Sequence, residues 1–125
     1  MGAQVFLGVS ALLWLPYGLF CLLQPAFLDD VAGVAARTAT GTVELRAMYG
    51  GLQAAIGALC GLGCVSPAWR GHALVALGFL TAGLGLARLA GVAAGGGLSA
   101  YTAGALILEF ASAGLALAFA RGRSG

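Results

Sequence analysis

Residues 89–120 read LAGVAAGGGLSAYTAGALILEFASAGLALAFA, an apolar stretch in which Glu109 is the only charged residue. Arg88 stands immediately before it. A charge at membrane depth is costly and generally turns toward the interior of a helix bundle, where it meets a partner. The stretch therefore predicts two membrane-spanning helices with a polar site beside them.

The composition of the whole chain extends this interpretation. The 125 residues are 61% hydrophobic and 8% charged, with a mean hydropathy of +1.00. Such a chain has too little polar surface for a water-soluble domain, so we predict a single integral membrane domain over residues 1–125. The six basic residues are all arginines and form no cluster, which argues against a nucleic-acid partner.

Four segments are long and apolar enough to cross a bilayer as helices, which takes about 20 residues each. Proline or glycine punctuates the connections between them. Because the last two connections are short, neighbouring helices should run antiparallel. The prediction is an all-α, four-transmembrane-helix antiparallel bundle with spans near residues 4–23, 42–64, 73–94 and 101–120.

The first connection, residues 24–41, is longer than the others. Apolar residues recur in it at helical spacing, with Asp29 and Asp30 early and Arg37 late, as the helix dipole favours. A short interfacial helix fits this pattern, and an irregular surface loop fits it nearly as well because Gly33 weakens the helix.

Polar residues from three of the spans are expected to converge. A rise of about 1.5 Å per residue places Arg88 roughly 9 Å from the end of the third span and Glu109 roughly 12 Å into the fourth. In the second span, Arg46, Tyr49 and Gln53 recur at helical spacing, so they should form one inward-facing stripe at similar depth. The candidate ligand-binding residues are Arg46, Tyr49, Gln53, Arg88 and Glu109.

Energetics favours a pair between Arg88 and Glu109. An unpaired charge at the centre of a span costs about 2.5–3.5 kcal/mol on insertion scales, and each Leu, Ile or Phe returns about 0.3–0.6 kcal/mol. The fourth span has seven such residues, which only about offset one unpaired glutamate. We expect Glu109 to pair with Arg88 or to be protonated, and Glu44 to lie near Arg46 closer to the surface.

Small residues predict close packing between helices. Gly57 and Gly61 form a small-xxx-small pair in the second span, and Gly83, Ala87 and Gly91 form a longer series in the third. We interpret both as packing seams inside the bundle. Because 22 of the 125 residues are glycine, these patterns indicate no specific dimer.

Metal chemistry is not expected. Cys21, Cys60 and Cys64 lie in apolar segments, where a thiol is most often a small buried hydrophobic group. With His72 as the only histidine, a structural zinc or a bis-histidine haem would have too few ligands. We predict no metal and no cofactor.

The sequence leaves several classes of function open. There is no pairing of a nucleophile with a base and no phosphate-cradling loop, so we predict no catalytic residue. The favoured hypothesis is a non-enzymatic binding or accessory subunit. Its polar site would hold a lipid-like or quinone-like amphiphile, or would dock against other membrane subunits or a second copy. The alternatives are a small enzyme or proton-coupled carrier using Glu109, and buried charges that only fix helix register.

The block ELRAMYGGLQ at residues 44–53, followed by Gly57, Arg88 and Glu109, resembles the bacterial four-span membrane proteins of the domain-of-unknown-function 4345 family. Similarity to DoxX-like proteins is looser. The resemblance covers nearly the whole chain, and its most specific element is the Arg-x-x-Tyr-Gly-Gly block. It implies four helices and a shared polar site, with no established activity.

Arginines near the span ends indicate the orientation. Arg70, Arg121 and Arg123 lie on the side of the N-terminus, whereas Arg37 and Arg46 lie on the other side. Cytoplasmic loops carry an excess of basic residues, so both termini are predicted in the cytoplasm. Together with the resemblance, this predicts a multi-pass protein of the bacterial inner membrane.

Overall fold

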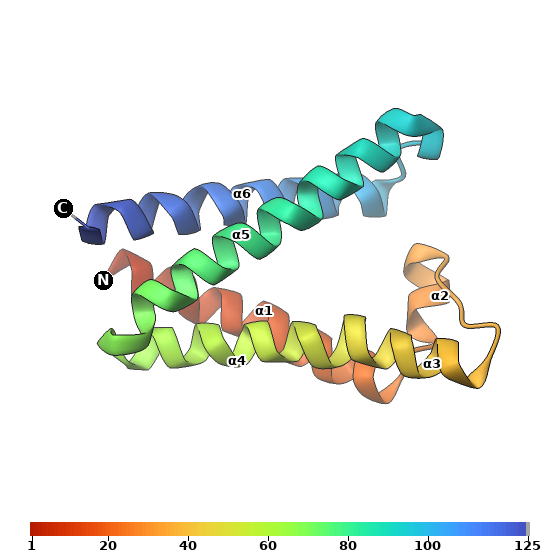
Figure 1. Cartoon of the computed structure of the whole chain (residues 1–125), viewed down its shortest axis with the longest axis horizontal. Helices are drawn as coiled ribbons and strands as arrows, with labels where there is room; N and C mark the ends of the chain where they lie inside the picture. Colours follow the sequence, from red (N-terminus) through yellow and green to blue (C-terminus); the bar gives the residue numbers. More distant parts are fainter. Residues whose placement is uncertain (125) are drawn as a thin grey trace.

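The chain folds into a bundle of four long helices, as a computed structural model of residues 1–124 shows (Figure 1). These residues contain no strand. Both termini lie at the same end of the bundle, and successive long helices run in opposite directions (Figure 1). The predicted all-α, four-helix architecture is confirmed. In chain order the elements are α1 (Gly2–Leu23), α2 (Phe27–Ala32), α3 (Ala39–Leu45), the π-helical turn η1 (Arg46–Gly51), α4 (Leu52–Val65), α5 (Pro67–Gly91), the π-helical turn η2 (Val92–Gly96) and α6 (Ala100–Ser124).

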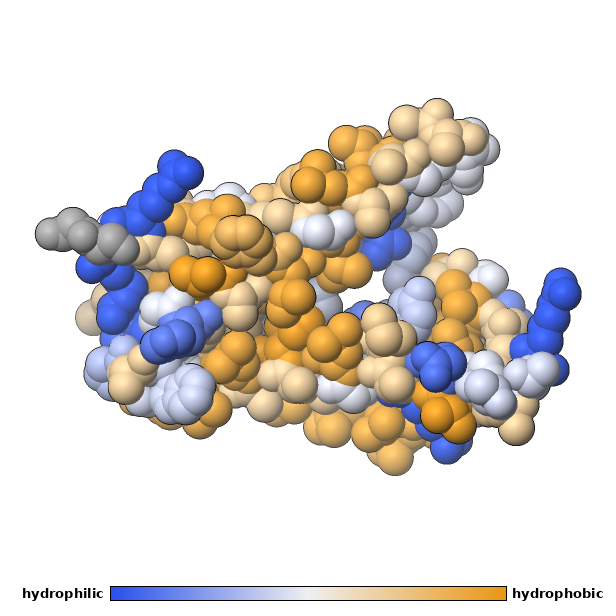
Figure 2. Space-filling view, viewed as in Figure 1, coloured by the Kyte–Doolittle hydropathy of each residue, from blue (hydrophilic) through white to orange (hydrophobic). Residues whose placement is uncertain are grey.

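The four long helices have the length and composition of membrane spans. Hydrophilic residues gather mostly at the two ends of the long axis, with hydrophobic residues between them (Figure 2). The protein is therefore a multi-pass membrane protein. The spans are Gly2–Leu23, Ala39–Val65, Pro67–Gly96 and Ala100–Arg123.

The third span begins at Pro67, earlier than the sequence pattern suggests. Proline suits the first turn of a helix, because the N–H that it lacks would have no partner there. Arg70 then bonds back to the end of α4: its Nε donates to the Gly63 carbonyl at 3.0 Å and its Nη2 to the Cys64 carbonyl at 3.1 Å. These bonds satisfy carbonyls that the end of α4 leaves free and fix the turn between the two helices.

The first connection is helical over Phe27–Ala32 and irregular over residues 33–38. Gly33 ends α2 in the left-handed conformation, with φ 67°, which glycine adopts at little cost. The next helix begins after Thr38, whose hydroxyl accepts a hydrogen bond from the Gly41 N–H at 3.0 Å. The helical interpretation of this connection is thus right for its first part.

Helices α1 and α4 approach each other so closely that glycine is required at their contact. A Cβ added to Gly57 would lie 2.7 Å from the Cα of Leu15, far inside van der Waals distance. One turn later, a Cβ on Gly61 would lie 3.9 Å from the Cβ of Ala11, an ordinary contact. The packing seam predicted at Gly57 and Gly61 is confirmed, with α1 as the opposing helix.

The hydrophobic core gathers at the end of the bundle that carries the termini. There all four long helices contribute to one buried cluster. Elsewhere α1 packs mainly on α4, and α5 packs mainly on α6. Toward the opposite end these two pairs diverge (Figure 1). The buried cluster comprises Leu7, Trp14, Ile56, Cys60, Ala73, Leu74, Leu77 and Ala116.

Candidate functional site

A cleft of about 960 Å³ lies between the α1–α4 pair and the α5–α6 pair. The space-filling view shows the molecule hollowed between these two halves, with a hydrophilic patch inside the hollow (Figure 2). Apolar side chains line most of the cleft, among them Leu13, Leu52, Ile56, Phe79, Leu80, Leu84 and Leu108. Its polar wall is formed by Trp14, Tyr17, Tyr49, Gln53, Arg88, Tyr101 and Glu109.

Arg88 and Glu109 form a charge-assisted, forked pair in the wall of this cleft. The Nε of Arg88 donates to both carboxylate oxygens at 3.1 Å, and its Nη2 donates to Oε1 at 2.7 Å. Glu109 is only 4% exposed, whereas the Arg88 side chain is 28% exposed. The pair predicted from the sequence is thus confirmed, and the arginine is the partner that faces the cleft.

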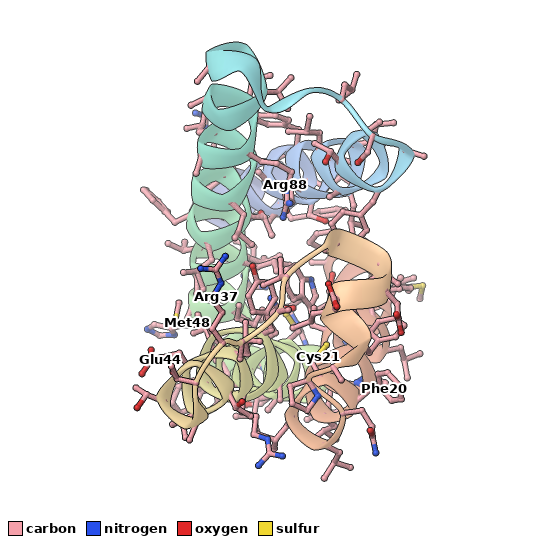
Figure 3. The ribbon with its side chains drawn as sticks, turned by 90° about the vertical axis from the view of Figure 1, so that its right-hand side faces the viewer. Phe20, Cys21, Arg37, Glu44, Met48 and Arg88 are labelled. Carbon is pink, nitrogen blue, oxygen red and sulfur yellow. The ribbon has the colours of Figure 1, made fainter. Side chains whose placement is uncertain are left out.

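Arg88 points from α5 into the space between the two helix pairs. Its guanidinium points from the α5–α6 half into the space above α1 and α4, while Met48 lies on the facing side (Figure 3). The Nη1 atom of Arg88 makes no hydrogen bond with residues 1–124. The Nε–Nη2 edge of the guanidinium is therefore bound to Glu109, and the Nη1 donors are left for another acceptor.

Tyrosines surround the pair. The Cζ of Arg88 lies 6.0 Å from the centre of the Tyr101 ring, within the range of a cation–π contact. The phenols of Tyr101 and Tyr49 both lie within electrostatic range of Arg88, and Tyr17 of α1 lies within range of Tyr101. Side chains from all four spans therefore gather in the wall of the cleft.

Several polar groups in this wall have no hydrogen-bond partner within residues 1–124. They are the hydroxyl of Tyr49, the amide of Gln53 and the indole N–H of Trp14. The hydroxyl of Tyr17 interacts instead with Tyr101 and with Cys21. Every fully buried side-chain nitrogen or oxygen in the described chain has a hydrogen-bond partner, so the unpartnered groups of the wall all keep some exposed surface. Because an unpaired donor in an apolar setting costs free energy, these groups gain from an acceptor placed in the cleft.

The small residues of α5 play a different part from the one expected. Gly83 and Ala87 line the cleft instead of contacting a neighbouring helix, and Cβ atoms added to Gly83 or Gly91 would meet nothing within 4 Å. The packing seam predicted at these positions is wrong. Their small side chains leave volume empty, and Gly104 does the same on α6.

Arg46 does not join the site, although the sequence pattern placed it there. It is exposed and does not line the cleft, whereas Tyr49 and Gln53 are half-buried and do. The cause is η1: a π-helical turn holds one residue more than an α-helical turn, which rotates the preceding residues by about 100°. The inward orientation expected for Arg46 is therefore wrong.

Glu44 does not form the expected pair with Arg46. Both side chains are exposed, and the ion pair between Arg88 and Glu109 is the one present in the described part of the chain. Glu44 points away from the molecule at its outer edge (Figure 3). Two residues apart on a helix, the side chains project about 200° apart and cannot meet.

Three site residues were not predicted: Trp14, Tyr17 and Tyr101. Tyr17 could have been found, because it stands three residues after Trp14, in the middle of an apolar span where polar rings seldom face lipid. Tyr101 lies at the start of the fourth span, nearer the membrane surface than the depth predicted for the site. Whether it reaches the site therefore depends on how α6 enters the bundle. Four of the five predicted residues line the cleft: Tyr49, Gln53, Arg88 and Glu109.

The wall of the cleft carries hydrogen-bonding groups and, among residues 1–124, no cluster of metal ligands. No group of three or more His, Cys, Asp or Glu side chains lies close enough to hold a metal ion within residues 1–124. Cys21 and Cys60 are buried free thiols outside the cleft lining. What the arrangement offers is hydrogen-bond donors beside an apolar surface.

Comparison with known proteins returns one family. No curated protein and no solved structure matches the chain. A family model described as a domain of unknown function, DUF4345, matches residues 2–120. That range takes in every residue that lines the cleft, the Arg88–Glu109 pair among them. The chain therefore belongs to the DUF4345 family of domains of unknown function.

Proposed function

We propose that this protein binds a membrane amphiphile in the cleft between its two helix pairs. The head of the ligand would contact Arg88 and the tyrosines, and its chain would lie against the leucines and Phe79. The observation that carries the proposal is a large, mainly apolar cleft with uncommitted hydrogen-bonding groups gathered at one part of its wall.

The size of the cleft supports a ligand larger than a few atoms. At about 960 Å³ it lies at the upper end of the range of small-molecule sites, which is about 300–1,000 Å³. In a membrane such a volume does not stay empty, because lipid or another amphiphile is always available to fill it. A ligand with a chain would also cover the apolar side chains that the cleft exposes.

The polar wall distinguishes an amphiphile from a plain transmembrane helix as the occupant. A partner helix uses its own backbone hydrogen bonds internally and has little to offer to the unpartnered polar groups of the wall. An oxygen-bearing head group can accept from them directly. We therefore place a ligand in the cleft, and an assembly in which a partner helix occupies it is the competing outcome of the test.

Filling the cleft should abolish binding. We expect Gly104→Phe to prevent binding, because a side chain at this position meets no protein atom within 4 Å and extends from the lining of the cleft. The measurement uses a Trp69→Phe background, in which Trp14, itself part of the cleft lining, is the single remaining tryptophan. Dibrominated stearate and its methyl ester, titrated into lipid nanodiscs, should quench Trp14 fluorescence before the substitution and at least about tenfold less after it.

Gly114→Phe supplies the matched control on the same helix. Gly114 is exposed, has no neighbour within 4 Å of an added Cβ and does not line the cleft. Its variant should retain the quenching of the parent protein. Failure of both brominated probes to quench Trp14 saturably, or equal quenching in the two phenylalanine variants, would refute binding in the cleft.

We also propose that the protein lies in the bacterial inner membrane with both termini in the cytoplasm. The end of the bundle that carries the termini also has Arg70, Arg121 and Arg123, against Arg37 and Arg46 toward the other end. Alkaline phosphatase fused after residue 124 should be inactive, and the same enzyme inserted at residue 35 should be active. Activity at residue 124 and none at residue 35 would show that the termini lie on the other side of the membrane.

A further inference from the structure

We propose that the cleft selects an uncharged head group that carries a carbonyl, such as an ester, ketone or quinone, and rejects carboxylates and phosphates. This inference rests on the proposed function, because it names the class of ligand that the cleft takes.

The first ground is the charge balance of the cleft. Arg88 and Glu109 are the only charged side chains in its lining. They are joined by three hydrogen bonds of 2.7–3.1 Å, so the positive charge of the guanidinium is already matched by a carboxylate at contact distance. The lining is neutral as a whole. An anionic ligand would meet no net positive charge there.

The second ground is the position of Glu109. An acceptor bound to the free Nη1 of Arg88 would share the guanidinium with the Glu109 carboxylate, which is bound to its other edge. A second negative charge at that distance is repelled, and water screens it poorly because Glu109 is 4% exposed. A neutral carbonyl oxygen accepts the same hydrogen bond without that repulsion.

The third ground is the kind of polar group that remains free. Arg88 Nη1 and the indole of Trp14 can only donate hydrogen bonds. The hydroxyl of Tyr49 can donate as well, and it has no hydrogen-bond partner within residues 1–124. A ligand that fits these groups offers acceptors. Carbonyl oxygens provide acceptors without carrying charge.

The two brominated probes test this directly, because they share one chain and differ only in the head group. Measured at about pH 9, where the stearate carboxyl is ionised, methyl dibromostearate should bind the Trp69→Phe protein at least about tenfold more tightly than dibromostearate. Glu109→Gln should reverse the order, because it leaves Arg88 as an unmatched cation. A reversal requires the stearate to gain more than the roughly tenfold by which the ester leads in the parent, so its affinity relative to the ester should rise at least about hundredfold.

The outcomes separate this inference from the proposed function. If the stearate binds as tightly as the ester or more tightly, selection for a neutral head is wrong, while binding in the cleft stands. If neither probe quenches Trp14, the proposed function fails and the inference fails with it. If Glu109→Gln folds and leaves the preference unchanged, the charge pair does not set selectivity. If that variant does not fold, the comparison in the parent protein decides alone.

Discussion

Arg88→Gln is expected to lower the free energy of unfolding by about 3–5 kcal/mol. The substitution removes the cation but leaves Glu109, which is 4% exposed and receives all its side-chain hydrogen bonds from Arg88. A buried carboxylate without its partner is far more costly than the intact pair is stabilising. The measurement is an SDS titration of the protein from lipid–detergent micelles, followed by tryptophan fluorescence.

The double variant Arg88→Gln/Glu109→Gln should recover most of that loss, because it removes both charges together. The coupling between the two positions should then be at least about 1 kcal/mol, as is usual for residues in one network. Arg121→Gln, at an exposed arginine with no ion pair, serves as the control and should change stability by less than about 0.5 kcal/mol. A single Arg88→Gln variant as stable as the parent would show that the pair is not buried from solvent and lipid.

Gly57→Ala is expected to destabilise the fold by about 1–3 kcal/mol, although it adds a single methyl group. That methyl carbon would lie 2.7 Å from both the Cα and the Cβ of Leu15 on α1. Backbone atoms cannot move aside as a flexible side chain can, so α1 must shift away from α4. The same SDS titration measures the loss.

Gly61→Ala is the matched control, because it makes the same chemical change one turn away on the same helix. Its new methyl carbon would lie 3.9 Å from Ala11 and needs no movement of α1. Alanine also favours a helix interior over glycine by about 1 kcal/mol, so this variant should be as stable as the parent or more stable. Equal losses for Gly57→Ala and Gly61→Ala would contradict the close approach of α1 and α4.

The spans and the charge pair could be predicted from the sequence because both depend on strong, simple terms. Twenty or so apolar residues specify a membrane helix by transfer free energy alone. Arg88 and Glu109 lie 21 residues apart in the sequence, and each charge is costly to bury in lipid. Pairing the two opposite charges lowers the free-energy cost of both. Antiparallel connection of neighbouring spans brings them to the same depth.

The orientation of Arg46 could not be predicted, because it depends on a local choice of hydrogen bonding. A regular α-helix through residues 39–65 would align Arg46 with Tyr49 and Gln53. The π-helical turn at Arg46–Gly51 breaks that alignment. The order of apolar and polar residues does not predict the extra residue of the π-helical turn, although Gly50 and Gly51 within it lower the cost of an irregular turn.

The open volume of the cleft also could not be predicted from the sequence. Small residues on a membrane helix favour close packing when a neighbouring helix is present, as at Gly57, and leave a hollow when it is absent, as at Gly83. The two outcomes depend on how far α5 and α6 diverge from α1 and α4. That divergence is a property of the packed bundle and not of any one helix.

The most direct test of a ligand-filled cleft is native mass spectrometry of the protein released from its own membranes, together with Gly104→Phe and Gly114→Phe. We predict that the parent chain and the Gly114 variant carry one bound neutral amphiphile, and that the Gly104 variant has lost it. A parent chain that leaves the membrane as a ligand-free monomer, or a Gly104 variant that keeps the same bound mass, would contradict this.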